Sequence, residues 1–380
     1  MHRLVIFALC CLIGLLGSTS ADARYASIVV DAGTGKVLHA VNADTRNFPA
    51  SLTKMMTLYL AFEALDSGRL DLAQKLRVSR TAAGRSPSKL GLKRGQTITV
   101  GDVIGTLVTK SANDVATVVA EALAGSERAF ARVMTRKAAE LGMTKTTFRN
   151  ASGLPHWRQR STARDMATLA RALVRNFPHH YHFFSLTSYN YAGRNYRNHN
   201  KLLTRYDGAD GIKTGYIRAS GYNLVASAER DGRRLVTVVF GGKSPRWRDR
   251  HVTGLMNRGF AALDRTLKPG RSGRASIWPP SPKPKPDLDE VRGWSIQVGA
   301  FNRFATAHLA VTRAARAVPD LLRIPVSIKN ERGDAGELYH ARLVGMSQDK
   351  ARRSCTTLMQ KNIRCIVLPD AASGVAEGSR

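Results

Sequence analysis

Residues 48–62 read FPASLTKMMTLYLAF and place a single charge, Lys54, inside an otherwise apolar helical pattern. Ser51 precedes Lys54 by three residues, so both side chains lie on one face of the predicted helix. Burial and a neighbouring cation both depress the pKa of a lysine, so this amine can be neutral near pH 7 and accept the serine proton. The structural alternative is a lysine that extends from a core helix to the surface.

The Ser-x-x-Lys pattern alone is weak, because it occurs three times, at residues 51–54, 86–89 and 347–350. The second copy lies in a polar, turn-like loop, and the third starts a solvated helix. Only the first copy places its serine and lysine on an apolar helix. We therefore assign chemistry to Ser51 and Lys54.

Two further short motifs follow. Residues 111–113 read Ser-Ala-Asn and open a predicted helix, so their structural alternative is an ordinary helix cap. A second Ser-x-Asn, at residues 188–190, lies among tyrosines in a predicted loop. Residues 213–215 read Lys-Thr-Gly within a predicted strand, where the alternative is an edge strand that carries a charge. Each motif alone leaves both readings open.

The order of the three motifs separates these readings. A Ser-x-x-Lys, a Ser-Ala-Asn about sixty residues later and a Lys-Thr-Gly about a hundred further on form the trio of penicillin-binding proteins and β-lactamases. The stretches FPASLTKMMT (48–57), NASGLP (150–155) and STARDMATLA (161–170) add flanking detail. Over residues 24–267 the chain therefore resembles the D-alanyl-D-alanine carboxypeptidases among the low-molecular-weight penicillin-binding proteins.

The resemblance implies catalytic roles for three residues. Ser51 would be the nucleophile, Lys54 the base that activates it, and Ser111 a relay for the proton on the other side of the cleft. Neither a metal nor a cofactor is implied. Thr162 and Asp165 fit a capping box, which we prefer to a catalytic role.

The same resemblance implies substrate-binding groups. Lys213 would be a second cation that helps to keep Lys54 neutral, while Thr214 and Arg248 bind the terminal carboxylate of the peptide. The backbone N–H groups of Ser51 and Tyr216 would form the oxyanion hole. The full binding set is Asn113, which would hold the peptide, with Lys213, Thr214, Gly215, Tyr216 and Arg248.

The implied activity is removal of the terminal D-alanine from peptidoglycan stem pentapeptides, with β-lactams as covalent inhibitors. D,D-endopeptidase action on crosslinks remains open, because it would use the same residues. A β-lactamase is disfavoured, because class A members use a glutamate to activate water and residues 141–228 contain none. A non-catalytic wall-binding protein is the alternative from a different class.

The predicted fold of residues 24–267 is α+β, the penicillin-binding protein/β-lactamase-like fold. Two β-rich runs flank a turn at residues 33–35, and three strands follow residue 210, with a tight turn at Asp231-Gly232. Strands at both ends of this region predict an antiparallel sheet with a helical insertion. Helical periodicity covers residues 51–66, 112–124, 127–141, 162–175 and 247–267.

A second domain follows a proline-rich linker at residues 268–291. Residues 292–368 have the β-α-β-β-α-β order of ferredoxin-like folds. Through WSIQVGAF and YHARLVG they resemble the SPOR domain of cell-division proteins. That likeness implies binding to denuded glycan strands at the division septum, with Gln297 the best contact and Arg342 the second. We predict a disordered tail at residues 369–380.

The first 23 residues have the basic start, apolar run and small-x-small end of a signal peptide. We therefore predict a periplasmic protein with no transmembrane anchor after cleavage. The net charge of +31 suggests an anionic partner such as wall polymer or a membrane surface, and the alternative is a solvated basic surface with no such partner. Export argues against nucleic acid. Cys355 and Cys365 fit either one disulfide or two free thiols.

Overall fold

The computed structural model describes residues 25–266, 293–301, 304–321, 324, 326–333 and 336–370. The predicted signal peptide and linker lie outside the described residues, as do residues 371–380 of the predicted tail. Within the described part of the chain, no helix is long and apolar enough to cross a membrane.

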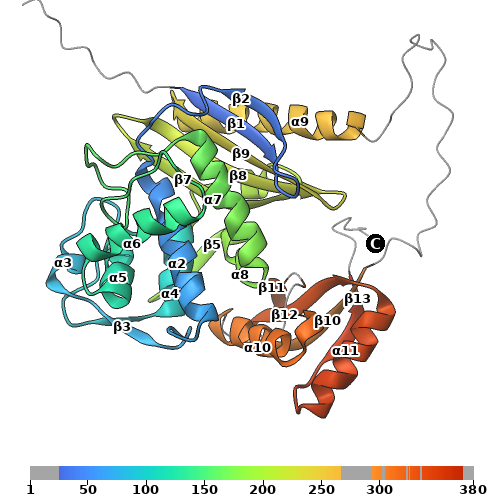
Figure 1. Ribbon diagram of the computed structural model, residues 1–380. Helices are drawn as coiled ribbons and strands as arrows, with labels where there is room; N and C mark the ends of the chain where they lie inside the picture. Colours follow the sequence, from blue (N-terminus) through green and yellow to red (C-terminus); the bar gives the residue numbers. More distant parts are fainter. Residues whose placement is uncertain are drawn as a thin grey trace, which may run out of the picture.

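A five-stranded sheet in the order β2-β1-β9-β8-β7 forms the centre of the larger unit (Figure 1). Strand β1 pairs antiparallel with both β2 and β9, so the N-terminal strand lies beside one that comes some two hundred residues later. This confirms the predicted sheet in which both ends of the region pair. The strands are β1 (Ala26–Asp31), β2 (Val37–Val41), β7 (Ala209–Ile217), β8 (Gly221–Arg230) and β9 (Arg233–Gly242).

Alternation along the strands gives the sheet two buried faces. Ile28 and Val30 belong to one hydrophobic cluster, while Val29 between them belongs to another. Helix α9 (Pro245–Thr266) covers the Val29 face, and α7 (Ala163–Asn176) packs on β1 and β9.

The turns that join the strands use the residues that the sequence indicated. Asp231 and Gly232 have φ angles of 50° and 69°, so both central residues of the β8–β9 turn are left-handed, as a type I′ hairpin requires. One half of the predicted capping box of α7 is present, because the backbone N–H of Asp165 donates to Thr162 Oγ1 at 3.0 Å. The Asp165 carboxylate instead accepts from the N–H of Lys145 at 3.0 Å and from Thr146 Oγ1 at 2.6 Å.

The inserted helices pack beside the sheet (Figure 1). Helix α4 (Val100–Thr109) was not predicted, because nearly all of its residues are buried and it lacks the polar face that makes a helix visible in a sequence. The other helices are α2 (Lys54–Asp66), α3 (Arg80–Ala83), α5 (Asn113–Ala124), α6 (Glu127–Glu140) and α8 (Pro178–Tyr181), and the short hairpins are β3 (Lys75–Arg77) with β4 (Thr97–Thr99) and β5 (Ser188–Tyr191) with β6 (Arg194–Arg197).

The smaller unit has its own hydrophobic core and a four-stranded antiparallel sheet in the order β11-β12-β10-β13. Its last strand reaches Pro369, and the N–H of Asp370 donates to the carbonyl of Gly293 at 2.7 Å, so ordered structure passes the predicted boundary. The elements are β10 (Trp294–Phe301), α10 (Phe304–Ala317), β11 (Val326–Gly333), β12 (Gly336–Met346), α11 (Gln348–Gln360) and β13 (Ile366–Pro369).

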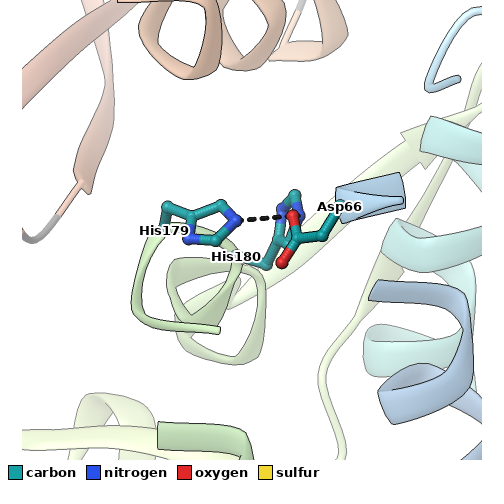
Figure 2. Close-up of side chains that lie close together, drawn as sticks. All are labelled: Asp66, His179 and His180. Atoms are coloured by element: carbon teal, nitrogen blue, oxygen red, sulfur yellow. Dashed lines mark hydrogen bonds and ion pairs between the residues drawn. The ribbon is translucent and has the colours of Figure 1, made fainter. Parts of the chain in front are cut away.

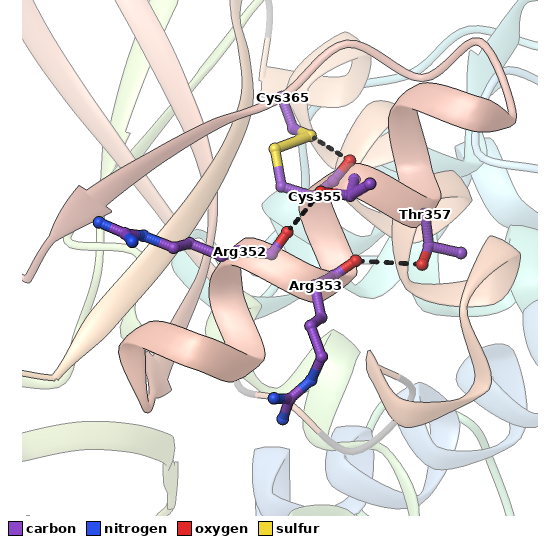
Figure 3. Close-up of a disulfide and its surroundings, with 6 residues drawn as sticks. Arg352, Arg353, Cys355, Thr357 and Cys365 are labelled. Carbon is purple, nitrogen blue, oxygen red and sulfur yellow. Dashed lines mark hydrogen bonds between the residues drawn. A yellow bond between two sulfur atoms is a disulfide. The ribbon is translucent and has the colours of Figure 1, made fainter.

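Cys355 and Cys365 are joined by a disulfide with an S–S distance of 2.07 Å. Figure 3 shows the bond between helix α11 and the segment that leads into β13. Of the two alternatives that the sequence left open, the structure has the bridge.

Candidate active site

Ser51 and Lys54 lie where a short 3₁₀ helix, Ala50–Thr53, runs into α2. Lys54 is completely buried, so a lysine that reaches the surface is ruled out. Its Nζ atom lies 3.2 Å from Ser51 Oγ. The hydroxyl and the amine are therefore within hydrogen-bond reach, as a nucleophile and its base must be.

Two other groups surround the amine of Lys54. Nζ lies 2.8 Å from Asn113 Oδ1 and 2.6 Å from the backbone carbonyl of Ser152, and both oxygens can only accept hydrogen bonds. A neutral amine has two N–H donors, which these acceptors occupy. Its lone pair is then left for the third neighbour, the Ser51 hydroxyl. The arrangement lets a neutral Lys54 accept the proton of Ser51.

Burial lowers the pKa of Lys54 well below its usual range, and the positive charge of Lys213 lowers it further. The carboxylates of Asp114 and Glu127 oppose this shift but have smaller effects. The balance favours the neutral amine, which is the form that can act as a base.

Lys213 lies on β7, which is an edge strand of the sheet, as the sequence indicated. Its side chain is only 2% exposed, so it is not the solvated charge of an ordinary edge strand. Burial and, to a smaller extent, the charge of Arg248 lower the pKa of Lys213 to about 7. Lys213 therefore loses its positive charge as the pH rises through about 7.

The backbone of β7 lies directly against the turn that carries Ser51. A Cβ atom added to Gly215 would lie 3.1 Å from both the carbonyl oxygen of Pro49 and the backbone nitrogen of Ser51. A Cβ at these distances would be tightly packed, and the neighbouring backbone would have to move by a few tenths of an ångström, so glycine favours this close approach. The next residue, Tyr216, is 52% exposed and stacks on Tyr222 with ring centroids 4.3 Å apart.

Ser111 does not cap a helix, contrary to the structural alternative. Helix α5 begins at Asn113, its cap residue is Ala112, and no side chain makes a cap hydrogen bond there. Ser111 has a φ angle of 59° and is 3% exposed, and among the described residues its Oγ atom has no hydrogen-bond partner. A buried, unpartnered hydroxyl on left-handed backbone is typical of a functional site.

The loop that supplies the Ser152 carbonyl had no predicted role, although its sequence was part of the resemblance. Asn150 Oδ1 accepts hydrogen bonds from the N–H groups of Ser152 (3.2 Å) and Gly153 (2.7 Å) and so fixes the turn. A Cβ on Gly153 would lie 1.8 Å from the carbonyl oxygen of Ala50, so the loop packs directly against the turn that carries Ser51. An asparagine two residues before a serine and three before a glycine is a turn signal that would have marked this loop.

Two buried acids near the site were also missed. Asp114 accepts hydrogen bonds from four backbone N–H groups at 3.0 to 3.2 Å, one from its neighbour Val115 and three from the distant residues Leu90, Gly91 and Leu92. Glu127 forms an ion pair with Arg85 and accepts a hydrogen bond from the N–H of Ala151 at 3.2 Å. On their helices both residues read as solvated acids, so no sequence signal marked them.

Positive groups gather around Lys213. Arg248 is 4% exposed and pairs with its neighbour Asp249, with Nη2 and Oδ1 2.7 Å apart. Burial, followed by the charges of Lys213 and Lys110, lowers the pKa of His199 to about 4. The structure thus brings together Ser51, Lys54, Asn113 and the Lys-Thr-Gly strand, with Arg248 close enough to influence Lys213.

Gln297 and Arg342 lie in the smaller unit, apart from this site. They face each other across β10 and β12, and Arg342 Nε donates to Gln297 Oε1 at 2.7 Å. Gln297 also borders a pocket of about 700 Å³ whose lining includes Gly299, Arg364 and Ile366. The two predicted contacts therefore form one polar pair.

Two features define the class of proteins with which this chain is compared: an antiparallel sheet with a helical insertion, and a buried serine–lysine pair. The D-alanyl-D-alanine carboxypeptidase family model matches residues 18–244. The chain belongs to this family.

Relatives and solved structures agree with this assignment. The chain is 35% identical over 258 residues to D-alanyl-D-alanine carboxypeptidase DacF of Bacillus subtilis, covering 65% of this chain and 64% of the relative. It is 38% identical over 248 residues to DacC of Escherichia coli, covering 63% and 62%. The match thus spans less than two thirds of each relative's length. The crystal structure of penicillin-binding protein 6B from Escherichia coli aligns with a TM-score of 0.59 at 34% identity, covering 63% of this chain and 77% of that one.

Replacement of Lys213 by methionine tests its influence on Lys54. Loss of this cation raises the pKa of Lys54, so we expect the acid limb of the acylation rate to move to higher pH, by on the order of one unit. Because Lys213 itself has a pKa of about 7, the difference from wild type should close as the pH rises above that value. The measurement is the rate of labelling by a fluorescent penicillin between pH 5 and 10. Lys201→Met, at an exposed position, is the matched control, and a uniform fall across the whole pH range would contradict the coupling.

Proposed function

We propose that the chain is a serine-type D-alanyl-D-alanine carboxypeptidase that removes the terminal D-alanine from peptidoglycan stem pentapeptides. The observation that carries the proposal is the environment of Lys54. Its amine is bound by Asn113 Oδ1 and the Ser152 carbonyl, two oxygens that can only accept hydrogen bonds. The third neighbour of the amine is Ser51 Oγ, at 3.2 Å. Family membership and the names of the relatives support the same activity.

Acylation follows from this geometry. Ser51 Oγ attacks the carbonyl carbon of the D-alanyl-D-alanine bond while Lys54 takes the hydroxyl proton. The tetrahedral intermediate then expels the amine of the last D-alanine, which must receive a proton as the C–N bond breaks. Ser111 can relay this proton from Lys54, because its hydroxyl is committed to no other described group. A water molecule then hydrolyses the ester and returns Ser51 to its free form.

The β7 strand supplies binding groups for the developing charges. Its close approach at Gly215 places the strand backbone beside the N–H of Ser51, which supports an oxyanion hole formed by the N–H groups of Ser51 and Tyr216. Lys213, Thr214 and Arg248 provide positive charge and a hydroxyl for the substrate's terminal carboxylate. Asn113, held between Lys54 and the Ser86 carbonyl, holds the peptide.

Two alternatives share this site. A D,D-endopeptidase would cut crosslinks after a D-alanine with the same residues. A non-catalytic wall-binding protein would have no reason to bury Lys54 beside a serine, since an unneeded buried amine costs stability. Incubation of the full chain with a pentapeptide and with a crosslinked dimer, and measurement of free D-alanine and of monomer, distinguishes the three. Turnover of neither substrate would overturn the proposal.

A β-lactam should form a long-lived acyl-enzyme on Ser51. The stretch 141–228 contains no glutamate, so the group that class A β-lactamases use to activate water is missing. A solved relative, penicillin-binding protein D2 from Listeria monocytogenes, is described in an ampicillin-bound form. After a pulse of fluorescent penicillin, we expect the label to persist for minutes or longer. Release at many turnovers per second, as in a dedicated hydrolase, would contradict this.

The smaller unit is proposed as a SPOR domain that binds denuded glycan strands and enriches the enzyme at the division septum. Its β-α-β-β-α-β order and its sheet order support a ferredoxin-like fold. Gln297 and Arg342 offer an amide and a guanidinium, which suit the hydroxyl and amide groups of a sugar chain. The start of the sequence supports export to the periplasm.

Arg342→Ala in the full chain should reduce binding to wall sacculi that an amidase has stripped of stem peptides. The Gln297–Arg342 hydrogen bond is lost, and with it one of the two polar groups proposed to contact glycan. We expect a several-fold drop in the bound fraction, with activity on soluble pentapeptide unchanged. Arg353→Ala removes the same charge from an exposed site on α11 and is the control. If both variants and the wild type bind the stripped sacculi equally, the proposed contact between Arg342 and glycan is wrong.

A further inference from the structure

A cluster of one carboxylate and two imidazoles lies at the far end of α2, where the two units meet. Asp66 is the last residue of α2, and His179 and His180 lie on the short helix α8. His179 Nε2 and His180 Nε2 lie 2.8 Å and 3.0 Å from Asp66 Oδ1. Figure 2 shows both rings turned toward the carboxylate. The three candidate ligand atoms are all within 4.8 Å of one another.

The two nitrogen–oxygen distances are close to the spacing of neighbouring ligands in a tetrahedral metal site. Zinc binds imidazole nitrogen and carboxylate oxygen at about 2.0–2.1 Å, so neighbouring ligands in a tetrahedron lie about 3.3 Å apart. The two nitrogen–oxygen distances are shorter than this by only a few tenths of an ångström. A small outward shift of the two nitrogens from Oδ1, with the two imidazole nitrogens, which lie within 4.8 Å of each other, brought to the same spacing, would replace two N–H···O hydrogen bonds by three bonds to one ion.

The second nitrogen of His180 is held by the smaller unit. His180 Nδ1 lies 3.4 Å from Nε2 of His308 on α10, and the two rings stack with centroids 5.4 Å apart. On its other side the His180 ring stacks on Phe62 at 5.0 Å. A metal-binding histidine usually makes a hydrogen bond with its other nitrogen, which fixes the ring and its tautomer. The ring of His180 is thus fixed with Nε2 toward Asp66.

We propose that Asp66, His179 and His180 bind one divalent transition-metal ion of the zinc class, and that His308 orients His180 for this task. The exposed fractions of the three side chains are 31%, 15% and 2%. The Asp66 side of the cluster is therefore open to solvent, which leaves room for a water molecule as the fourth ligand. Helix α2 separates the cluster from Lys54 by roughly 18 Å at 1.5 Å per residue, so the ion takes no part in peptide hydrolysis.

One neighbouring charge opposes the ion. Arg316 Nη2 lies 3.7 Å from Asp66 Oδ1 and donates to the carbonyl of Leu65 at 3.1 Å. Because the Arg316 side chain is 49% exposed, it can keep the bond to Leu65 and leave Asp66 to the metal. Removal of its charge by Arg316→Gln should therefore leave Zn²⁺ affinity equal or higher, although a contact between the units is lost.

The test is Zn²⁺ binding by the full chain after treatment with a chelator. Competition with a chromogenic chelator should give one Zn²⁺ per chain, and Co²⁺ should give the strong visible absorption of a tetrahedral site. Asp66→Asn keeps an oxygen that accepts both N–H groups, and His179→Gln keeps an N–H donor, so thermal unfolding without metal should change little. Each should bind Zn²⁺ at least tenfold more weakly and lose the Co²⁺ signal.

Two further variants complete the experiment. His156→Gln removes a histidine from a different loop and should bind Zn²⁺ like wild type. His308→Phe keeps a ring against His180 but removes its nitrogen partner, so we expect roughly tenfold weaker binding with the Co²⁺ signal retained. If wild type, Asp66→Asn and His179→Gln take up the same amount of Zn²⁺ with the same affinity, the cluster is a hydrogen-bonded trio only and the proposal is wrong.

Discussion

Ser51→Ala is expected to abolish both release of D-alanine from a pentapeptide and labelling by penicillin. Among the described residues, Ser51 has the only side-chain hydroxyl that is hydrogen-bonded to the amine of Lys54. When it is removed, no other hydroxyl is in place to give its proton to this amine and act as the nucleophile. Loss of the nucleophile in a serine peptidase costs on the order of 10⁶-fold in kcat. The fold should persist, because the change removes one half-buried hydroxyl and leaves the backbone in place. Thermal unfolding of the purified variant checks this.

A matched control exists within the chain. Ser347→Ala changes another Ser-x-x-Lys serine, which caps helix α11 in the smaller unit by accepting from the N–H of Lys350 at 3.3 Å. We expect a stability loss of about 1 kcal/mol from the missing cap and full labelling by penicillin. D-alanine release by Ser51→Ala above the background of a mock preparation would refute the assignment of the nucleophile.

The sequence predicted those parts of the site that rest on local pattern. Lys54 was expected to be buried because its helix neighbours are apolar on every side, and the structure has it completely buried. The closing of the sheet by β1 and β9 was also predicted, since β-rich runs at both ends of a domain have few other partners. The first prediction rests on a pattern within one helix, and the second on the order of strands and helices along the chain.

The groups that could not be predicted depend on contacts between distant segments. The Ser152 carbonyl is a backbone atom, and its position is set by Asn150 and by the turn around Ser51 rather than by its own side chain. Asp114 accepts hydrogen bonds from N–H groups more than twenty residues away. The residues next to Asp114 in the sequence give no sign of these contacts. His308 is fully buried only because the two units pack together, whereas its own helix reads as that of an independent domain.

Lys54→Arg is expected to reduce acylation nearly as much as loss of the serine. A guanidinium remains charged at any working pH, so it cannot take the proton of Ser51. General-base catalysis contributes about 10²–10⁴-fold, and the variant should lose at least this factor in the rate of penicillin labelling. Because the obstacle is a permanent charge, raising the pH to 10 should restore none of the rate.

The larger side chain could also disturb the site, so a second variant is needed. Lys54→Met fills a similar volume without a charge, although it leaves Asn113 Oδ1 and the Ser152 carbonyl without their donor. If lost basicity is the cause, Lys54→Met and Lys54→Arg should be slowed alike while their thermal unfolding differs. If either variant kept more than about one hundredth of the wild-type rate of labelling, a group other than Lys54 would have to be the base. Lys213 would be the first candidate, because its pKa of about 7 leaves it partly neutral at the same pH.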